Sequence, residues 1–131
     1  MSWLATRIKW IMLVSGLLTC TMFYAAIAPQ AALRLMFGEE LSGAVAQIVV
    51  RNWGALIGLG GLMLVFGAFN PPVRRFSLSV AGLSKLAFSG LVLFYGRQYL
   101  GYQAGAAVVG DLAMVLLFAM YLLTAPHEAT A

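Results

Sequence analysis

The chain has 131 residues, of which 63% are apolar and only 9% are charged, whereas soluble domains carry roughly 25% charged residues. Eight basic and four acidic side chains cannot form the polar exterior that a water-soluble domain of this size needs. The net charge of +4 is spread along the chain without a basic stripe, which argues against a nucleic-acid partner. The composition therefore predicts an integral membrane protein, with residues 1–131 forming a single membrane domain.

Four apolar runs are long enough to cross about 30 Å of hydrocarbon, which takes about 20 helical residues. They cover residues 8–28, 44–69, 76–96 and 104–123. The first run ends at Pro29, which cannot continue a helix with a normal hydrogen bond. We expect Ser42 to cap the second run, and Asn70, Pro71 and Pro72 to end it abruptly. The predicted fold is all-α, an integral membrane four-helix bundle whose second and third helices are antiparallel neighbours.

The segment between the first two runs, residues 30–37, reads QAALRLMF. Leu33, Met36 and Phe37 are spaced to lie along one surface around Arg34. This pattern predicts a short interfacial helix between the first and second spanning helices, in preference to a catalytic loop.

The charges that flank the runs predict an orientation, because basic residues favour the cytoplasmic side of a membrane. The residues on one side are Arg7, Lys9, Arg74 and Arg75, and those on the other are Arg34, Arg51, Arg97, Glu39 and Glu40. The bias places both termini in the cytoplasm. Aromatic residues near the predicted span ends are expected to be interfacial anchors; they are Trp3, Trp10, Trp53, Tyr95 and Tyr121.

The second run carries a helix-packing pattern, because Gly54, Gly58 and Gly61 recur at spacings of four and three and so share one face. Such a groove lets another helix approach closely. Packing within the bundle is the favoured interpretation, with dimerisation or docking to a larger partner as the alternatives. The same face reaches Arg51 and Gln47, so the groove is polar at one end.

Lys85 lies near the middle of the third run, where an unpaired charge costs about 2.5 to 3.5 kcal/mol. Gly82 and Ser89 share its helix face and leave room for the long side chain. In the fourth run, Asp111 lies within about 5 Å of Lys85 in depth by the helical rise. We therefore expect Lys85 and Asp111 to pair. The candidate ion cluster comprises Arg51, Asn52, Lys85 and Asp111.

Three roles for this cluster are open from the sequence. Lys85 and Asp111 could form a structural bridge that fixes helix register. With Arg51 they would carry one surplus positive charge, which could bind an anion, a phospholipid headgroup or a carboxylate. A lysine made neutral by desolvation could instead transfer protons.

The sequence lacks the residues that several kinds of functional site need. His127 is the only histidine and Cys20 the only cysteine, so we expect no metal site, no haem and no disulfide. The glycines at 58, 60 and 61 lie inside a predicted span, which is the wrong context for phosphate binding. We expect no cofactor and no catalytic residues.

The segments APQAALRLMFG, VRNWGALIGLGGLMLVFGAFNPPVRR, AGLSKLAFSGLVLFYG and GDLAMVLLFAMYLL, in this order, resemble small bacterial four-helix membrane proteins of uncharacterised function, distantly similar to the DoxX-like group. The resemblance covers most of the chain and implies an inner-membrane four-helix bundle. It carries no established catalytic residues. All members of the candidate ion cluster fall within these segments.

Two functions are compatible with these features. The favoured one is a non-catalytic accessory or structural subunit, which docks through its glycine groove and apolar faces onto a larger membrane complex or a second copy. The alternative is a binding or transport module for an anion or lipophilic ligand, with the ion cluster lining the site. Membrane lipids are expected partners in either case.

Overall fold

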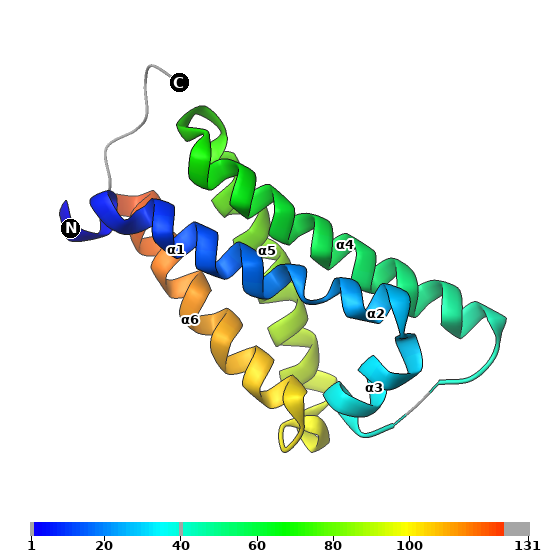
Figure 1. Cartoon of the computed structure of the whole chain (residues 1–131). Coiled ribbons are helices and arrows are strands. Elements are labelled where there is room, and N and C mark those ends of the chain that lie inside the picture. Colours follow the sequence, from blue (N-terminus) through cyan, green and yellow to red (C-terminus); the bar gives the residue numbers. More distant parts are fainter. Residues whose placement is uncertain (1, 40, 125–131) are drawn as a thin grey trace.

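The computed structural model describes residues 2–39 and 41–124, with side chains described for 6–39 and 41–123. All regular structure in these residues is helical, which confirms the all-α prediction. The elements in chain order are α1 Ser2–Cys20, α2 Phe23–Ile27, α3 Pro29–Phe37, α4 Ala44–Phe69, α5 Pro71–Tyr95, the 3₁₀ turn η1 Arg97–Tyr99, and α6 Gln103–Thr124 (Figure 1).

Within the described residues, four helical stretches are long and apolar enough to cross a membrane. They are Thr6–Ile27, Ala44–Phe69, Pro71–Tyr95 and Gln103–Leu123. Their outward surfaces are apolar, as the high exposure of Ile27 and Leu91 illustrates, whereas Lys85, Arg74 and Ser77 are buried. This distribution is the inverse of that of a water-soluble protein and agrees with a multi-pass membrane protein.

The first predicted run, 8–28, is interrupted, a break that we did not predict. Thr21 and Met22 form a turn between α1 and α2, and the backbone N–H of Thr21 bonds to Leu18 O, three residues back. The Thr21 hydroxyl donates to the same carbonyl at 2.5 Å. Threonine hydroxyls compete in this way with the regular helical ladder, so the chain bends here without a proline.

Prolines begin helices in this fold rather than only ending them. Pro29 is the first residue of α3, and Pro71 opens α5 five residues before the predicted start at 76. Proline suits a first helical position because the N–H it lacks would have no partner there. The expected cap at Ser42 is wrong: Gly43 precedes α4 without a side-chain cap bond, and its φ of 102° requires glycine.

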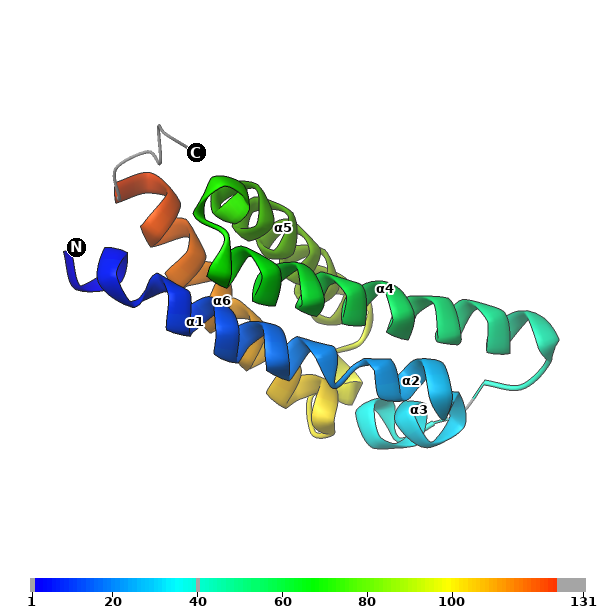
Figure 2. The same ribbon diagram turned by 45° about the horizontal axis from the view of Figure 1, so that its top comes forward.

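The long helices form two pairs. In the first pair α1 and α2 pack along α4, and in the second α5 packs on α6. The pairs meet at the end where α4 leads into α5 and diverge toward the other end, where α3 lies between them (Figures 1 and 2). The predicted contact between α4 and α5 is present. The core where the pairs meet comprises Ile8, Met12, Leu64, Ala68, Leu78, Ala81, Phe118 and Tyr121.

Arginine side chains satisfy carbonyl groups at the ends of helices. The hydrogen bonds run from Arg51 to Ala26 O and Ile27 O, from Arg74 to Gly67 O and Ala68 O, from Arg75 to Leu122 O, and from Arg97 to Leu93 O. The last four carbonyls of a helix have no partner within the helix, and a cation there also interacts favourably with the helix dipole. The arginines therefore stabilise the ends of α2, α4, α5 and α6.

Candidate functional site

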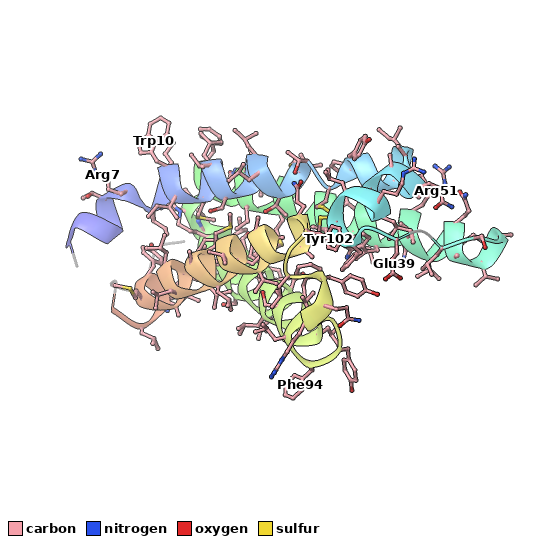
Figure 3. All side chains as sticks on the ribbon, turned by 90° about the horizontal axis from the view of Figure 1, so that it is seen from below. Arg7, Trp10, Glu39, Arg51, Phe94 and Tyr102 are labelled. Atoms are coloured by element: carbon pink, nitrogen blue, oxygen red, sulfur yellow. The ribbon has the colours of Figure 1, made fainter. Side chains whose placement is uncertain are left out.

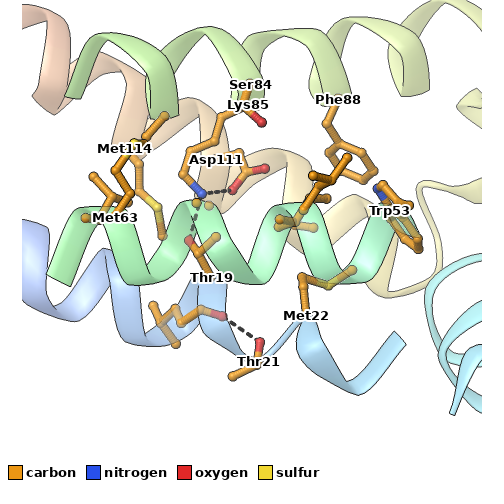
Figure 4. A pocket seen from close by; sticks show the side chains of 18 of the residues that line it. Thr19, Thr21, Met22, Trp53, Met63, Ser84, Lys85, Phe88, Asp111 and Met114 are labelled. Atoms are coloured by element: carbon orange, nitrogen blue, oxygen red, sulfur yellow. Dashed lines mark hydrogen bonds and ion pairs between the residues drawn. The ribbon is translucent and has the colours of Figure 1, made fainter. Parts of the chain in front are cut away.

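A cavity of about 380 Å³, open over part of its surface, lies between the two helix pairs (Figure 4). Small-molecule sites typically have volumes of about 300 to 1,000 Å³. The wall is largely apolar and includes the methionines Met22, Met36, Met63 and Met114 and the aromatic residues Trp53 and Phe88. Its polar groups include Thr19, Lys85 and Asp111, which lie together on one stretch of the wall.

The expected ion pair is present in this cavity. Lys85 Nζ on α5 lies 3.1 Å from Asp111 Oδ1 on α6, and the two side chains are 8% and 19% exposed. Each charge is thus paired where hydrocarbon would otherwise surround it, which removes most of the cost of an isolated ion. Because both residues also line the cavity, the pair is accessible to a molecule inside it.

A third residue, Thr19 on α1, completes the polar group. Lys85 Nζ donates to Thr19 Oγ1 at 3.0 Å, and Thr19 Oγ1 donates to Ser15 O at 2.7 Å. Our sequence reasoning assigned no role to Thr19. The available signal was a pair of hydroxyl residues four positions apart in the first run, on one helix face.

The other two residues predicted beside Lys85 share its buried face. Gly82 and Ser89 are buried together with Lys85 on α5. A Cβ at Gly82 would lie 4.0 Å from Phe118 Cδ2, an ordinary contact. Ser89 Oγ is buried and has no hydrogen-bond partner among the described residues. The predicted orientation of this helix face is therefore confirmed, although Gly82 itself is not under steric constraint.

Arg51 and Asn52 do not join the site. Arg51 is exposed and donates to Ala26 O at 2.6 Å, and it lies toward the end of the molecule that carries Glu39, far from Arg7 (Figure 3). Asn52 is exposed as well, and neither residue lines the cavity. Arg51 continues the glycine face of α4, and that face packs on α2 rather than toward Lys85. The expected surplus positive charge is therefore missing from the cavity.

The glycine face of α4 is filled by the chain's own first helices. A Cβ at Gly54 would come within 2.7 Å of Ala25 Cβ, and one at Gly58 within 2.6 Å of the Phe23 ring. At Gly61 the nearest atoms are backbone atoms, Cys20 N and Gly16 O, both at 2.6 Å. The prediction of packing within the molecule is confirmed, and this groove has no room for a docking partner.

Trp53 and Phe88 separate the cavity from an open surface groove, since both residues line both hollows. Their rings stack at 24° with centroids 6.4 Å apart, and Phe37 from α3 lies against Trp53 at 6.3 Å. The half-buried Trp53 thus forms part of the cavity wall rather than a simple surface anchor. The same expectation is wrong for Tyr121, which is 2% exposed in the core.

The structure describes the side chains of only two of the remaining predicted anchors. Trp10 and Tyr95 are exposed, as an interfacial position requires, whereas the side chain of Trp3 lies outside the described residues. His127 and Glu40 also lie outside them. Within residues 2–39 and 41–124, no group of three or more His, Cys, Asp or Glu side chains could hold a metal ion.

Comparison with known proteins supplies no relative. No family model matches the chain, and neither a curated protein nor a solved structure matches it. The resemblance to the DoxX-like group therefore stays a prediction, and the cavity is the feature of the molecule that points to a function.

Proposed function

We propose that this chain is a four-helix bundle of the bacterial inner membrane that binds a lipophilic small molecule between its two helix pairs. The observation that carries the proposal is a buried ion pair, Lys85 with Asp111, on the wall of a cavity of about 380 Å³. In this arrangement α3 lies at the membrane interface and contributes Met36 to the cavity wall.

The cavity supports a binding site over a purely structural bridge. A bridge that only fixes helix register needs its charges sealed by neighbouring side chains, because every exposed polar atom in an apolar space costs free energy. Here Lys85 and Asp111 border open volume. The apolar wall would bury the ligand's hydrocarbon part, while the polar group would orient its head. Methionine side chains are flexible and adapt to irregular ligand shapes.

The accessory-subunit function has less structural support. Its expected docking groove at Gly54, Gly58 and Gly61 is occupied by α1 and α2. The apolar outer faces of the helices need no protein partner, since membrane lipids cover such surfaces. We therefore place ligand binding ahead of docking.

A pair of glycine variants tests the proposal. Gly110 lines the cavity, Gly90 does not, and a Cβ at either position meets no atom within 4 Å. Gly110→Leu should therefore fill part of the cavity while leaving Lys85 and Asp111 in place, and Gly90→Leu is the matched control. Native mass spectrometry of protein gently extracted from its own membrane should show a bound small molecule with the natural sequence and with Gly90→Leu. The Gly110→Leu protein should carry much less of it.

Lys85→Met extends the test to the polar group. The same bound molecule should be lost from Lys85→Met and retained by Lys9→Met, because Lys9 lies outside the cavity wall. Equal occupancy in all variants, or an empty cavity in the natural protein, would contradict the proposal. A retained protein partner that is indifferent to both changes would favour the accessory role.

A further inference from the structure

The charge balance of the cavity restricts the chemistry of its ligand. Among the residues that line it, Lys85 supplies one positive charge and Asp111 one negative charge, and the two are in contact. Arg51, which would have made the site cationic, points to α2 instead. Building on the proposed function, we infer that the ligand carries an uncharged, oxygen-containing head group, in its simplest form a lipophilic alcohol, rather than a carboxylate or phosphate.

The hydrogen-bonding capacity of the polar group matches such a head. An ammonium group has three N–H donors, and Lys85 uses two of them for Asp111 and Thr19 among the described contacts. Thr19 cannot donate to a ligand at the same time, because its proton is committed to Ser15 O. A carboxylate has about four acceptor sites, and Lys85 occupies one on Asp111. A ligand hydroxyl can accept a hydrogen bond from the third N–H of Lys85 and donate one to the Asp111 carboxylate.

An ionic head group would gain much less. An anion close enough to bond with Lys85 also lies within a few ångströms of the Asp111 carboxylate, so repulsion offsets most of the attraction. It would in addition lose its own hydration on entering an apolar cavity. A cationic head group close enough to bond with Asp111 is likewise repelled by the nearby Lys85 ammonium. A hydroxyl or carbonyl oxygen avoids both costs and uses the existing dipole of the pair.

The position of the aromatic wall gives the ligand a direction. Phe88 follows Lys85 by three residues on α5, about 4.5 Å along the helix axis, and Trp53 stacks on Phe88. The cavity wall continues on both sides of the ion pair, toward these rings and Met22 on one side and toward Met63 and Met114 on the other (Figure 4). A ligand with its head at Lys85 and its tail in the aromatic part of the cavity lies near Trp53, which can report on binding.

The test uses the fluorescence of Trp53 as the readout. Trp3→Phe and Trp10→Phe leave Trp53 as the sole tryptophan of the chain. In lipid nanodiscs at pH 8, 10-bromodecanol and 10-bromodecanoate are compared at equal membrane concentrations, since terminal bromine quenches a nearby indole. We expect saturable quenching by the alcohol at a concentration about tenfold or more below that of the carboxylate, because the carboxylate is repelled by Asp111. Gly110→Leu should abolish the saturable part.

Asp111→Asn provides the reciprocal change. It leaves Lys85 as the only charge on the cavity wall, so the carboxylate should become the preferred probe. If this variant does not fold, the comparison of the two probes with Asp111 present still decides. If the protein with Asp111 present binds the carboxylate preferentially, the neutral-head inference is overturned and the proposed function still stands. Quenching that does not saturate with either probe, or that persists in Gly110→Leu, overturns both.

Discussion

At the residue scale, the ion pair is the main polar contact between helices in the interior of this protein. Lys85 contacts side chains on two other helices, Asp111 on α6 and Thr19 on α1. One ammonium group thereby joins the second helix pair to the first across the cavity. Removing one partner of a buried pair leaves the other charge without compensation, which costs more than the pair itself contributes.

This asymmetry predicts strong coupling between the two positions. Asp111→Asn and Lys85→Met should each lower the free energy of unfolding by about 3 kcal/mol. The double variant Lys85→Met with Asp111→Asn should recover a large part of the summed loss, because it leaves no buried charge. Reversible unfolding in mixed micelles of increasing SDS content measures the three values. Strictly additive losses would show that the pair contributes nothing as a pair.

The sequence predicted this pair because depth along two helices can be read from residue positions alone. Thr19 escaped prediction because the rotation of α1 about its axis is set by its close packing against α4 at Gly16 and Gly61. Arg51 was misplaced for a related reason. The sequence grouped Arg51 with Lys85 and Asp111, but its helix face is fixed by the glycines that hold α4 against α2. Depth is a property of one chain segment, whereas helix rotation is a property of the packing.

At the element scale, α1 packs so closely against α4 that backbone atoms of one helix lie where a Cβ of the other would be. Gly61 faces Cys20 N and Gly16 O, and a Cβ at Gly16 would lie 2.7 Å from Gly61 O. Glycine is thus needed on both helices at this crossing. Small residues permit such close packing in membranes, where van der Waals contacts replace the hydrophobic effect between helices.

Neighbouring glycines on α4 allow a matched test of this crossing. Gly61→Ala should lower the free energy of unfolding by about 1 to 3 kcal/mol, because the methyl group meets backbone that cannot move aside cheaply. Gly60→Ala should be neutral or stabilising by up to about 1 kcal/mol, since a Cβ there meets no atom within 4 Å. Unfolding of both variants under the same conditions gives the comparison. Equal effects at the two positions would refute the close approach.

At the scale of the whole molecule, composition and hydrophobic run length predicted the all-helical class and the four apolar stretches. They did so because a bilayer allows few other ways to satisfy a backbone. The cavity was beyond prediction, since it results from the divergence of two helix pairs and from the placement of α3 between them (Figure 1). No local pattern encodes that angle. The run QAALRLMF predicted a helix but not that Met36 would line the cavity.

The placement of the helix ends allows a test of orientation. The start of α1, the end of α6 and the link between α4 and α5 lie at one end of the molecule (Figures 1 and 2), together with Arg7, Lys9, Arg74 and Arg75 on the sequence-based assignment. We predict that this end faces the cytoplasm. In a Cys20→Ala background, Ser42→Cys and Pro72→Cys place single exposed thiols at opposite ends.

A maleimide that cannot cross the inner membrane should therefore label Ser42→Cys in cells with a permeabilised outer membrane. Pro72→Cys should react only after the inner membrane is lysed. The reverse pattern would invert the orientation while leaving the helix arrangement intact. Labelling of both positions before lysis would contradict the four-span topology itself, because an even number of crossings between Ser42 and Pro72 is incompatible with the single helix α4 that joins them.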